Sequence, residues 1–178
     1  RHAVGPRVQC ARHPQGLRER LEGGLDDVVR VATVAHVDVQ VHPGGRHQRL
    51  EKILGKAHAM TDLTGFGIAG HLSGICEASG VAAEISLDAV PLMQGALALA
   101  EKGVRSSLYP DNVSGAGVVA GRKGPRADLM FDPQTAGGLL AAVPADKADE
   151  LVKKLWLAGY PAAKIGRLIE GLPSVTLI

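Results

Sequence analysis

The order of the segments from residue 58 to the carboxyl end constrains the fold most, because strand-like and helix-like stretches follow one another without strict alternation. The expected strands are short apolar or alternating runs between turn residues: residues 81–87, 128–131, 139–143, 162–169 and 175–178. The expected helices carry apolar residues at helical spacing and end at glycines: residues 68–80, 91–103 and 144–159. This mixed order favours an α+β fold, with helices packed on a mixed β-sheet, over a doubly wound parallel sheet.

Two stretches rich in glycine and proline interrupt the pattern. Residues 105–127 predict a long irregular loop, which in a compact domain is usually functional or mobile. Residues 132–138 (DPQTAGG), here called the second motif, predict a turn, because Asp-Pro initiates turns and Gly-Gly permits close backbone contact. The sequence leaves open whether this turn is structural or lines a ligand site.

The first third of the chain differs in composition from the rest. Residues 1–57 are rich in arginine and histidine, carry a net positive charge and contain no aromatic side chain, whereas the remainder is net negative. Since aromatic side chains dominate core energetics, we expect these first 57 residues and the remainder to differ in structural character. In the first part, the patterns predict a mobile segment at residues 1–24, one or two valine-rich strands at 25–41 and a short helix at 48–57.

Composition excludes several classes of protein. An apolar fraction of 46% is that of a globular chain, and no apolar run approaches the roughly 20 residues of a membrane helix. The amino-terminal residues lead into no signal sequence, and two cysteines are too few for a disulfide framework. We therefore expect a soluble, cytoplasmic protein with no membrane partner, and the initial Arg1 indicates a fragment or processed piece.

A polar, glycine-rich loop is predicted at residues 61–67 (TDLTGFG), here called the first motif. It overlaps a G-x-G-x-x-G pattern at residues 65–70, and Glu84 follows near the spacing of a dinucleotide site. A dinucleotide site also needs an apolar strand before the first glycine, whereas residues 58–64 are largely polar. A dinucleotide-binding module is therefore the less favoured alternative.

The first motif suits a phosphate or a metal-bound phosphate better. Asp62 supplies one carboxylate, Thr61 and Thr64 supply hydroxyls, and Gly65 and Gly67 bring backbone amides to the start of a helix. The structural alternative is that Asp62 or Thr64 only caps that helix. Both interpretations stay open at this point.

Single residues elsewhere have structural explanations. Cys76 falls on the apolar helix face and is expected in the core, whereas Cys10 has no identifiable partner base. His71 is expected to be a hydrogen-bonded structural histidine, and Asn112 begins a glycosylation sequon that carries no meaning without a secretory signal. The arginine-rich beginning lacks interleaved aromatic residues, so a solvated tail is favoured over a nucleic-acid partner.

Two blocks of sequence resemble the carboxy-terminal half of selenophosphate synthetases (selenide, water dikinases). They are residues 58–72 and 131–140, in the family's order, and residues 162–167 are similar to the family's last strand. The resemblance covers residues 53–178. Ala136 and the stretch 105–108 are similar to members fused to a flavin-dependent, NADH-dehydrogenase-like domain.

The resemblance implies a fold and a reaction. The fold is the carboxy-terminal domain of the aminoimidazole ribonucleotide synthetase type, in an enzyme that is usually a homodimer. The reaction converts ATP, selenide and water to selenophosphate, AMP and phosphate, with Mg²⁺ as cofactor. The family's amino-terminal domain supplies the reactive cysteine or selenocysteine, a lysine and most acidic ligands, while Asp62 would be the metal ligand of this half. Thr61, Thr64, Gly65 and Gly67 would line the nucleotide.

Residues 1–52 depart from the family. Neither Cys10 nor Cys76 lies in the family's nucleophile motif, so the chain carries no catalytic residue of its own. The composition of residues 1–52 is what a wrong reading frame in a GC-rich gene produces, and a diverged or fused segment is the alternative. Because one carboxylate cannot hold a Mg²⁺–ATP cluster, we expect an incomplete enzyme that is inactive alone. The alternative is a non-catalytic remnant or interface domain.

Overall fold

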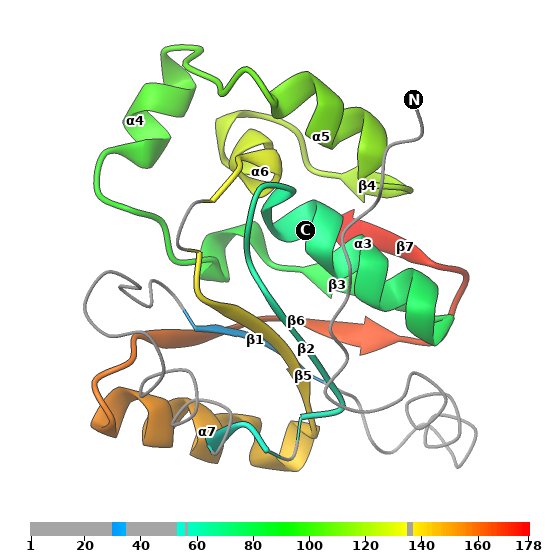
Figure 1. Cartoon of the computed structure of the whole chain (residues 1–178), viewed down its shortest axis with the longest axis vertical. Helices are drawn as coiled ribbons and strands as arrows, with labels where there is room; N and C mark the ends of the chain where they lie inside the picture. Colours follow the sequence, from blue (N-terminus) through cyan, green and yellow to red (C-terminus); the bar gives the residue numbers. More distant parts are fainter. Residues whose placement is uncertain (1–29, 35–52, 56, 135–136) are drawn as a thin grey trace.

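Figure 1 shows the computed structural model of the chain, which describes residues 30–34, 53–55, 57–134 and 137–178. Within these residues the strands are β1 (Arg30–Val34), β2 (Ala59–Asp62), β3 (Ala82–Ile85), β4 (Val119–Gly121), β5 (Leu139–Val143), β6 (Ala162–Ile169) and β7 (Ser174–Leu177). The α-helices are α3 (Gly67–Ser79), α4 (Ala96–Glu101), α5 (Tyr109–Gly115), α6 (Pro125–Asp128) and α7 (Ala145–Leu157). Short 3₁₀ helices are η1 (Leu87–Ala89) and η2 (Leu129–Phe131).

These strands form one mixed sheet in the order β2-β5-β1-β6-β3-β7-β4. Neighbours from β2 through to β3 pair antiparallel, whereas the pairs β3–β7 and β7–β4 are parallel. The predicted α+β fold with a mixed sheet is therefore confirmed. Strand β2 lies at one edge, which places its end near the rim of the sheet.

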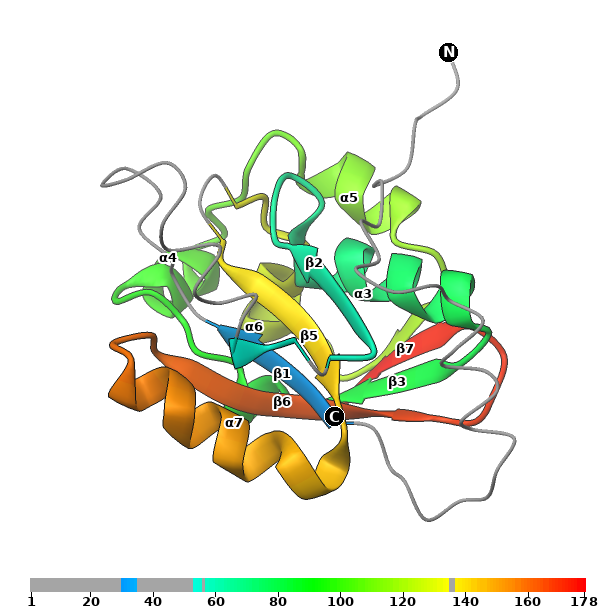
Figure 2. The same ribbon diagram turned by 60° about the horizontal axis from the view of Figure 1, so that its bottom comes forward.

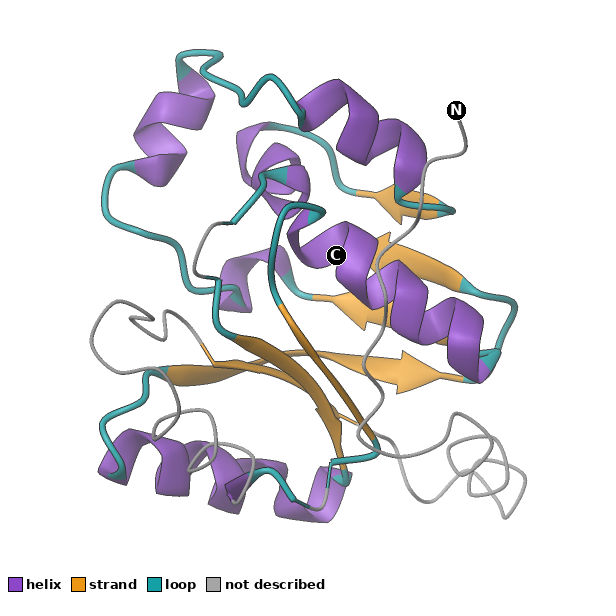
Figure 3. Ribbon diagram, viewed as in Figure 1, coloured by secondary structure: helices purple, strands orange, loops and turns teal. Residues whose placement is uncertain are grey.

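Helices cover both faces of the sheet (Figures 1 and 2). Helix α7 packs against β1 and β6 on one face, while α3 packs against β3, β5 and β7 on the other. Figure 3 shows α5 and α6 on the same side as α3, farther from the sheet. Within the described residues, no helix has the length and apolarity needed to cross a membrane.

Strand β5 contributes to two separate apolar cores, because successive side chains of a strand point to opposite faces. Leu140 and Ala142 belong to the core beneath α3, whereas Leu139, Ala141 and Val143 belong to the core beneath α7. All five residues are buried, so the predicted buried strand is confirmed.

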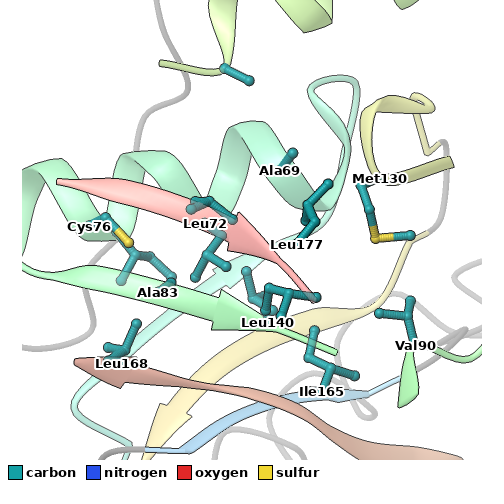
Figure 4. Close-up of a cluster of buried hydrophobic side chains, with 14 of the residues drawn as sticks. Ala69, Leu72, Cys76, Ala83, Val90, Met130, Leu140, Ile165, Leu168 and Leu177 are labelled. Carbon is teal, nitrogen blue, oxygen red and sulfur yellow. The ribbon is translucent and has the colours of Figure 1, made fainter. Parts of the chain in front are cut away.

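The core beneath α3 contains the apolar helix face expected from the sequence. Leu72, Ile75 and Cys76 are almost completely buried, and Figure 4 shows Leu72 and Cys76 above side chains of the sheet such as Ala83 and Leu168. Burial raises the pKa of the Cys76 thiol to about 12. Cys76 is therefore a small core residue, as predicted, and not a thiolate nucleophile at neutral pH.

The prediction for residues 105–131 is wrong in most of its detail. The stretch expected to be an irregular loop contains α5, β4 and α6, and the expected strand at 128–131 is the end of α6 followed by η2. The prolines explain the error. Pro110 and Pro125 stand in the first turns of α5 and α6, where the missing N–H has no helical partner to lose.

Two predicted helices differ from the expectation in part. Helix α4 begins at Ala96 rather than Pro91, and Leu99, which the spacing predicts to face inward, is 53% exposed. The third predicted helix is confirmed as α7, but Trp156 is mostly exposed and donates its indole N–H to the carbonyl of Ala162. Trp156 therefore satisfies its polar atom at the surface instead of filling the core.

Strand β1 lies on the amino-terminal side of residue 53, where the resemblance to the family begins. It pairs with β5 on one side and with β6 on the other, in the middle of the sheet. Arg30–Val34 is thus part of the domain's fold, in agreement with the predicted valine-rich strand. The predictions for residues 1–24 and most of 48–57 lie outside the described residues.

Candidate functional site

The end of edge strand β2 carries the candidate metal ligand. Residues 59–62 pair with β5 as a strand, so the loop predicted from residue 61 begins only at Leu63. Thr61 is buried, and its hydroxyl donates to the Asp62 carbonyl over 3.2 Å. The Asp62 side chain itself is exposed, and its carboxylate has no hydrogen-bond or ion-pair partner among the described residues. The strand thus presents one available carboxylate at the sheet edge.

His71, in the first half of α3, makes hydrogen bonds to the loop that connects β2 to α3. The residue is 3% exposed, and its Nε2 accepts the backbone N–H of Thr64 over 3.0 Å. The Thr64 hydroxyl lies 3.1 Å from the same nitrogen. Burial lowers the pKa of His71, an effect that the charge of Asp62 opposes. The ring is therefore neutral near pH 7, and the predicted structural histidine is confirmed.

The hydrogen bonds of His71 define which nitrogen of its neutral ring carries the proton. Because Nε2 accepts a hydrogen bond, the proton is carried by Nδ1. Nδ1 of His71 is buried and has no hydrogen-bond partner within the described part of the chain. The histidine therefore contributes to the site through one nitrogen only.

Helix α3 begins without a side-chain cap. Its N-cap residue is Phe66, and no side chain accepts a hydrogen bond from the first turn. The structural alternative, in which Asp62 or Thr64 caps this helix, is therefore wrong. Gly67 has φ of 68°, and a Cβ there would lie 2.6 Å from the Met130 carbonyl oxygen. This glycine permits the close approach of the chain that leads into the second motif.

The G-x-G-x-x-G pattern serves packing within the protein. The space beside Gly67 is filled by the backbone near Met130, and a Cβ on Gly70 would lie 2.9 Å from the Phe66 Cβ. Of the three glycines, Gly65 alone has open space, with no atom within 4 Å of an added Cβ. A strand does precede the pattern, but it is antiparallel to its neighbour rather than part of a parallel βαβ unit. These contacts do not favour the dinucleotide alternative.

The two motifs are joined by backbone hydrogen bonds. Leu63 N–H donates to the Gly138 carbonyl over 2.9 Å, and Gly137 N–H donates to the Leu63 carbonyl over 3.2 Å. Gln134 N–H donates to the Thr64 carbonyl over 3.0 Å. A Cβ on Gly137 would lie 2.6 Å from the Leu63 carbonyl oxygen, so glycine is required for this contact. The described part of the second motif is therefore one wall of the same site.

Asn112 of α5 connects the motifs a second time. Its side-chain Nδ2 donates to the Gly65 carbonyl over 2.8 Å and to the Phe131 carbonyl over 2.9 Å. Gly65 belongs to the first motif, and Phe131 lies directly before the second. Sequence reasoning missed this role, because the only signal at Asn112 was the sequon.

A charged cluster supports this side of the site. Arg105 forms an ion pair with Asp128, and the Tyr109 hydroxyl donates to the same carboxylate over 2.8 Å. Burial, together with the Asp128 carboxylate, raises the pKa of Tyr109, so the hydroxyl keeps its proton. Burial also raises the pKa of the Asp132 carboxyl, against the opposing charge of Arg105. Sequence reasoning assigned no such role to Arg105 or Tyr109.

A pocket of about 450 Å³ opens beside the junction of the two motifs. Leu63 and Gly137 contribute to its rim from the two motifs, and Met130 is among its apolar lining residues. Asp132 and Gln134 add polar groups, and the Gln134 amide donates to the Asp132 carbonyl over 3.2 Å. The pocket is large enough for part of a small-molecule ligand.

The donor set can hold a metal ion only as part of a larger site. Within the described ranges, no group of three or more His, Cys, Asp or Glu side chains is close enough to bind a metal. Asp62 offers one exposed carboxylate. Protein-bound Mg²⁺ usually has one or two carboxylate ligands, with waters and phosphates as the others. The arrangement fits one ligand of a shared Mg²⁺ site and does not fit a complete one.

Comparison with protein families gives one match that covers most of the chain. The family described as "AIR synthase related protein, C-terminal domain" matches residues 26–177. The matched region begins before residue 53 and includes β1.

Curated relatives are selenide, water dikinases. The chain is 40% identical over 126 residues to that of Rhizobium meliloti (strain 1021), a match that covers 68% of this chain and 36% of that protein. It is 39% identical over 122 residues to that of Aeromonas salmonicida (strain A449), covering 68% of this chain and 35% of that protein. The resemblance stated from the sequence is confirmed, and the chain spans about a third of the length of these relatives.

Solved structures share the fold. The hydrogenase maturation protein HypE of E. coli superposes with a TM-score of 0.58 at 20% identity, covering 86% of this chain and 46% of that one. PurL of T. maritima complexed with ATP gives a TM-score of 0.53 at 14% identity, covering 85% of this chain and 23% of that one. At these identities the likeness shows the fold alone, and it agrees with the predicted type of carboxy-terminal domain.

Proposed function

The chain belongs to the family of AIR synthase related proteins, of which it carries the C-terminal domain, and we propose that it is the carboxy-terminal part of a selenophosphate synthetase. The full enzyme would convert ATP, selenide and water to selenophosphate, AMP and phosphate. The observation that carries the proposal is the exposed Asp62 carboxylate, which has no hydrogen-bond or ion-pair partner among the described residues and stands at the end of β2, beside a loop that is hydrogen-bonded to the second motif. The names of the curated relatives support the reaction.

Asp62 would be this domain's ligand to Mg²⁺, which when bound neutralises phosphate charge during phosphoryl transfer. Gly65, with open space beside it, would let a phosphate approach the loop backbone. Thr61 would act through its hydrogen bond to the Asp62 carbonyl, and Thr64 through its contact with His71. Gly67 would set the position of the loop rather than touch the nucleotide, since Met130 fills the space beside it.

The rest of the site would come from an amino-terminal domain of the same family. The matched relatives are about three times as long as the matched region, and the described part of this chain holds no group of three or more His, Cys, Asp or Glu side chains that could bind a metal ion. We infer that the complete protein is a cytoplasmic homodimer that uses ATP and selenide. The 178-residue chain alone is expected to form no selenophosphate.

The test joins this chain to the amino-terminal part of the Rhizobium meliloti relative, the part that precedes the matched region. Selenide-dependent conversion of ATP to AMP, with selenophosphate as product, is the expected result. Asp62→Asn should lower the turnover by orders of magnitude, and added Mg²⁺ should restore part of it, because the variant removes one charge from the metal site. The melting temperature should stay close to that of the unchanged protein, since the Asp62 carboxylate has no partner to lose in the described part of the chain.

Asp149→Asn is the matched control. Asp149 is also an exposed aspartate, but it lies on α7, across the sheet from the first motif, and pairs with Lys164. Its substitution should leave turnover unchanged. Normal turnover in Asp62→Asn would end the metal-ligand assignment, and an inactive fusion that is folded would favour the non-catalytic interface domain.

A further inference from the structure

Asn112 occupies a position between the two motifs that no catalytic assignment covers. It lies near the middle of α5, is 7% exposed, and has its side-chain nitrogen within hydrogen-bond distance of two carbonyl oxygens. One carbonyl, that of Gly65, follows Asp62 by three residues. The other, that of Phe131, immediately precedes Asp132. The contacts therefore join the two loops that flank the candidate site.

The chemistry of the side chain explains why an amide stands here. A primary amide nitrogen carries two protons that point in different directions, so one nitrogen can donate to two separate acceptors. The two donor–acceptor distances, 2.8 and 2.9 Å, are both those of good N–H···O bonds. Aspartate has the same shape but would bring a carboxylate oxygen against two carbonyl oxygens. Serine and threonine have one proton to give.

Among the described residues, these two bonds connect through a side chain two loops that are otherwise joined through backbone. The bonds from Leu63, Gln134 and Gly137 align the motifs edge to edge on the strand side of the loop. Asn112 reaches Gly65 from the helix side, where the chain has already turned toward α3. The loop is therefore held from two sides, and its freedom to move Asp62 relative to Asp132 is reduced.

Contacts of Tyr109 hold helix α5 in place beside the two motifs. Tyr109, three residues before Asn112 and on the same helix face, donates to Asp128 and packs edge-on against the Phe131 ring. Within one turn of α5, Tyr109 therefore fixes the helix to Asp128, and Asn112 joins the two motifs. With its amide protons in use and its surface buried, Asn112 is no glycosylation acceptor in the folded chain.

We propose that Asn112 is a positioning residue, which fixes the loop after Asp62 against the segment leading into the second motif through both protons of its amide. The bridge is a property of this chain alone, whereas its importance for catalysis rests on the proposed function. Tight control of distance matters for such a site, because a ligand displaced by a fraction of an ångström no longer meets its phosphate and metal partners.

Amide hydrogen exchange of the 178-residue chain tests the bridge directly. In Asn112→Ala and Asn112→Asp, the amides of Gly67 and Gln134 should exchange about tenfold faster or more, because loss of the bridge leaves one buried and one partly buried carbonyl without their donor. Amides of α7 and β6 should keep their protection. Ser114→Ala is the matched control, since it removes an exposed hydrogen bond from the same helix, that of the Ser114 hydroxyl to the Asp111 carbonyl, and should leave the amides of both motifs unchanged.

A measurement on the unchanged chain covers the case in which both variants fail to fold. In NMR spectra, the two side-chain amide protons of Asn112 should exchange with water far more slowly than those of an exposed asparagine or glutamine. Rapid exchange of either proton overturns the bridge. Unchanged exchange at Gly67 and Gln134 in folded Asn112 variants overturns it too, as does an equal acceleration in Ser114→Ala.

The active fusion protein then tests the positioning role. Asn112→Ala should raise the Mg²⁺ concentration needed for half-maximal rate more than it lowers the rate at saturating Mg²⁺, a split that general loss of folded protein does not produce. A fall in maximal rate with an unchanged Mg²⁺ requirement contradicts positioning. If the unchanged fusion makes no selenophosphate, the proposed function fails, while the exchange results still decide whether Asn112 forms the bridge.

Discussion

The two faces of the sheet are built in different ways. Beneath α7, one regular amphipathic helix packs Ala148, Leu151 and Leu155 onto β5 and β6. On the other face, α3 also packs apolar residues, but short helices and loops lie beyond it, joined by single hydrogen bonds and by glycines in close backbone contact. Thr61 and the candidate site residues that follow Asp62 lie on or beside this second, irregular face, whereas Asp62 itself stands at the end of edge strand β2, in register with Leu139.

The difference shows which requirement shaped each face. A face that only has to exclude water can repeat one spacing of apolar residues along a helix and a strand. A face that has to present Asp62 and keep it in register with a second loop needs specific bonds at specific atoms. We therefore expect substitutions beneath α7 to act on global stability and substitutions around the motifs to act on local geometry.

The largest effect on stability is expected for Leu155→Ala. Leu155 is completely buried between α7 and the sheet, and removing its side chain should lower the free energy of unfolding by about 2–5 kcal/mol. Leu157→Ala, on the same helix but 80% exposed, should change it by less than about 0.5 kcal/mol. Urea unfolding measures both. A loss below about 1 kcal/mol in Leu155→Ala would show that α7 is not the main support of its face.

A smaller effect is expected for Gly67→Ala on the irregular face. The new Cβ would stand at positive φ and 2.6 Å from the Met130 carbonyl oxygen, so the two segments must separate at a cost of about 1–3 kcal/mol. Gly65→Ala is the matched control, because nothing lies within 4 Å of its added Cβ. The same urea titration compares the two, and equal losses would mean that Gly67 is not a special contact.

The smallest effect is a pH dependence that comes from His71. Burial lowers the pKa of His71 below its ordinary 6.5, so the unfolded chain binds the proton at a higher pH than the folded one. This contribution to stability is present above pH 6.5 and is lost as the pH falls below it, until the folded-state pKa is reached. His71→Gln should reduce the slope of unfolding free energy against pH between pH 7 and 5. An unchanged slope would indicate that the folded protein accepts the proton freely.

The sequence predicted the regular face well and the irregular face poorly. The period of α7, the apolar run of β5 and the alternation of β6 each follow from one local spacing, so their assignments are correct. The prediction for residues 105–131 failed because the elements there are short. Tertiary hydrogen bonds, such as that from Tyr109 to Asp128, stabilise these elements more than local preference does. Family resemblance proposed Asp62 as a metal ligand, which stays a prediction. Only the folded chain could bring Asn112 to Gly65, since nothing local in the sequence relates the two.

The central position of β1 has a consequence for how this domain can form. Arg30 pairs with Val143 on one side and Arg167 on the other, so the middle of the sheet is completed by contacts between residues more than a hundred positions apart. Such contacts give a high contact order, and folding that depends on them is slow compared with helical packing. A chain that began at residue 53 would leave β5 and β6 each with an unpaired edge in mid-sheet, and exposed edges of this kind pair with other molecules. We therefore expect the minimal unit able to fold without self-association to include β1.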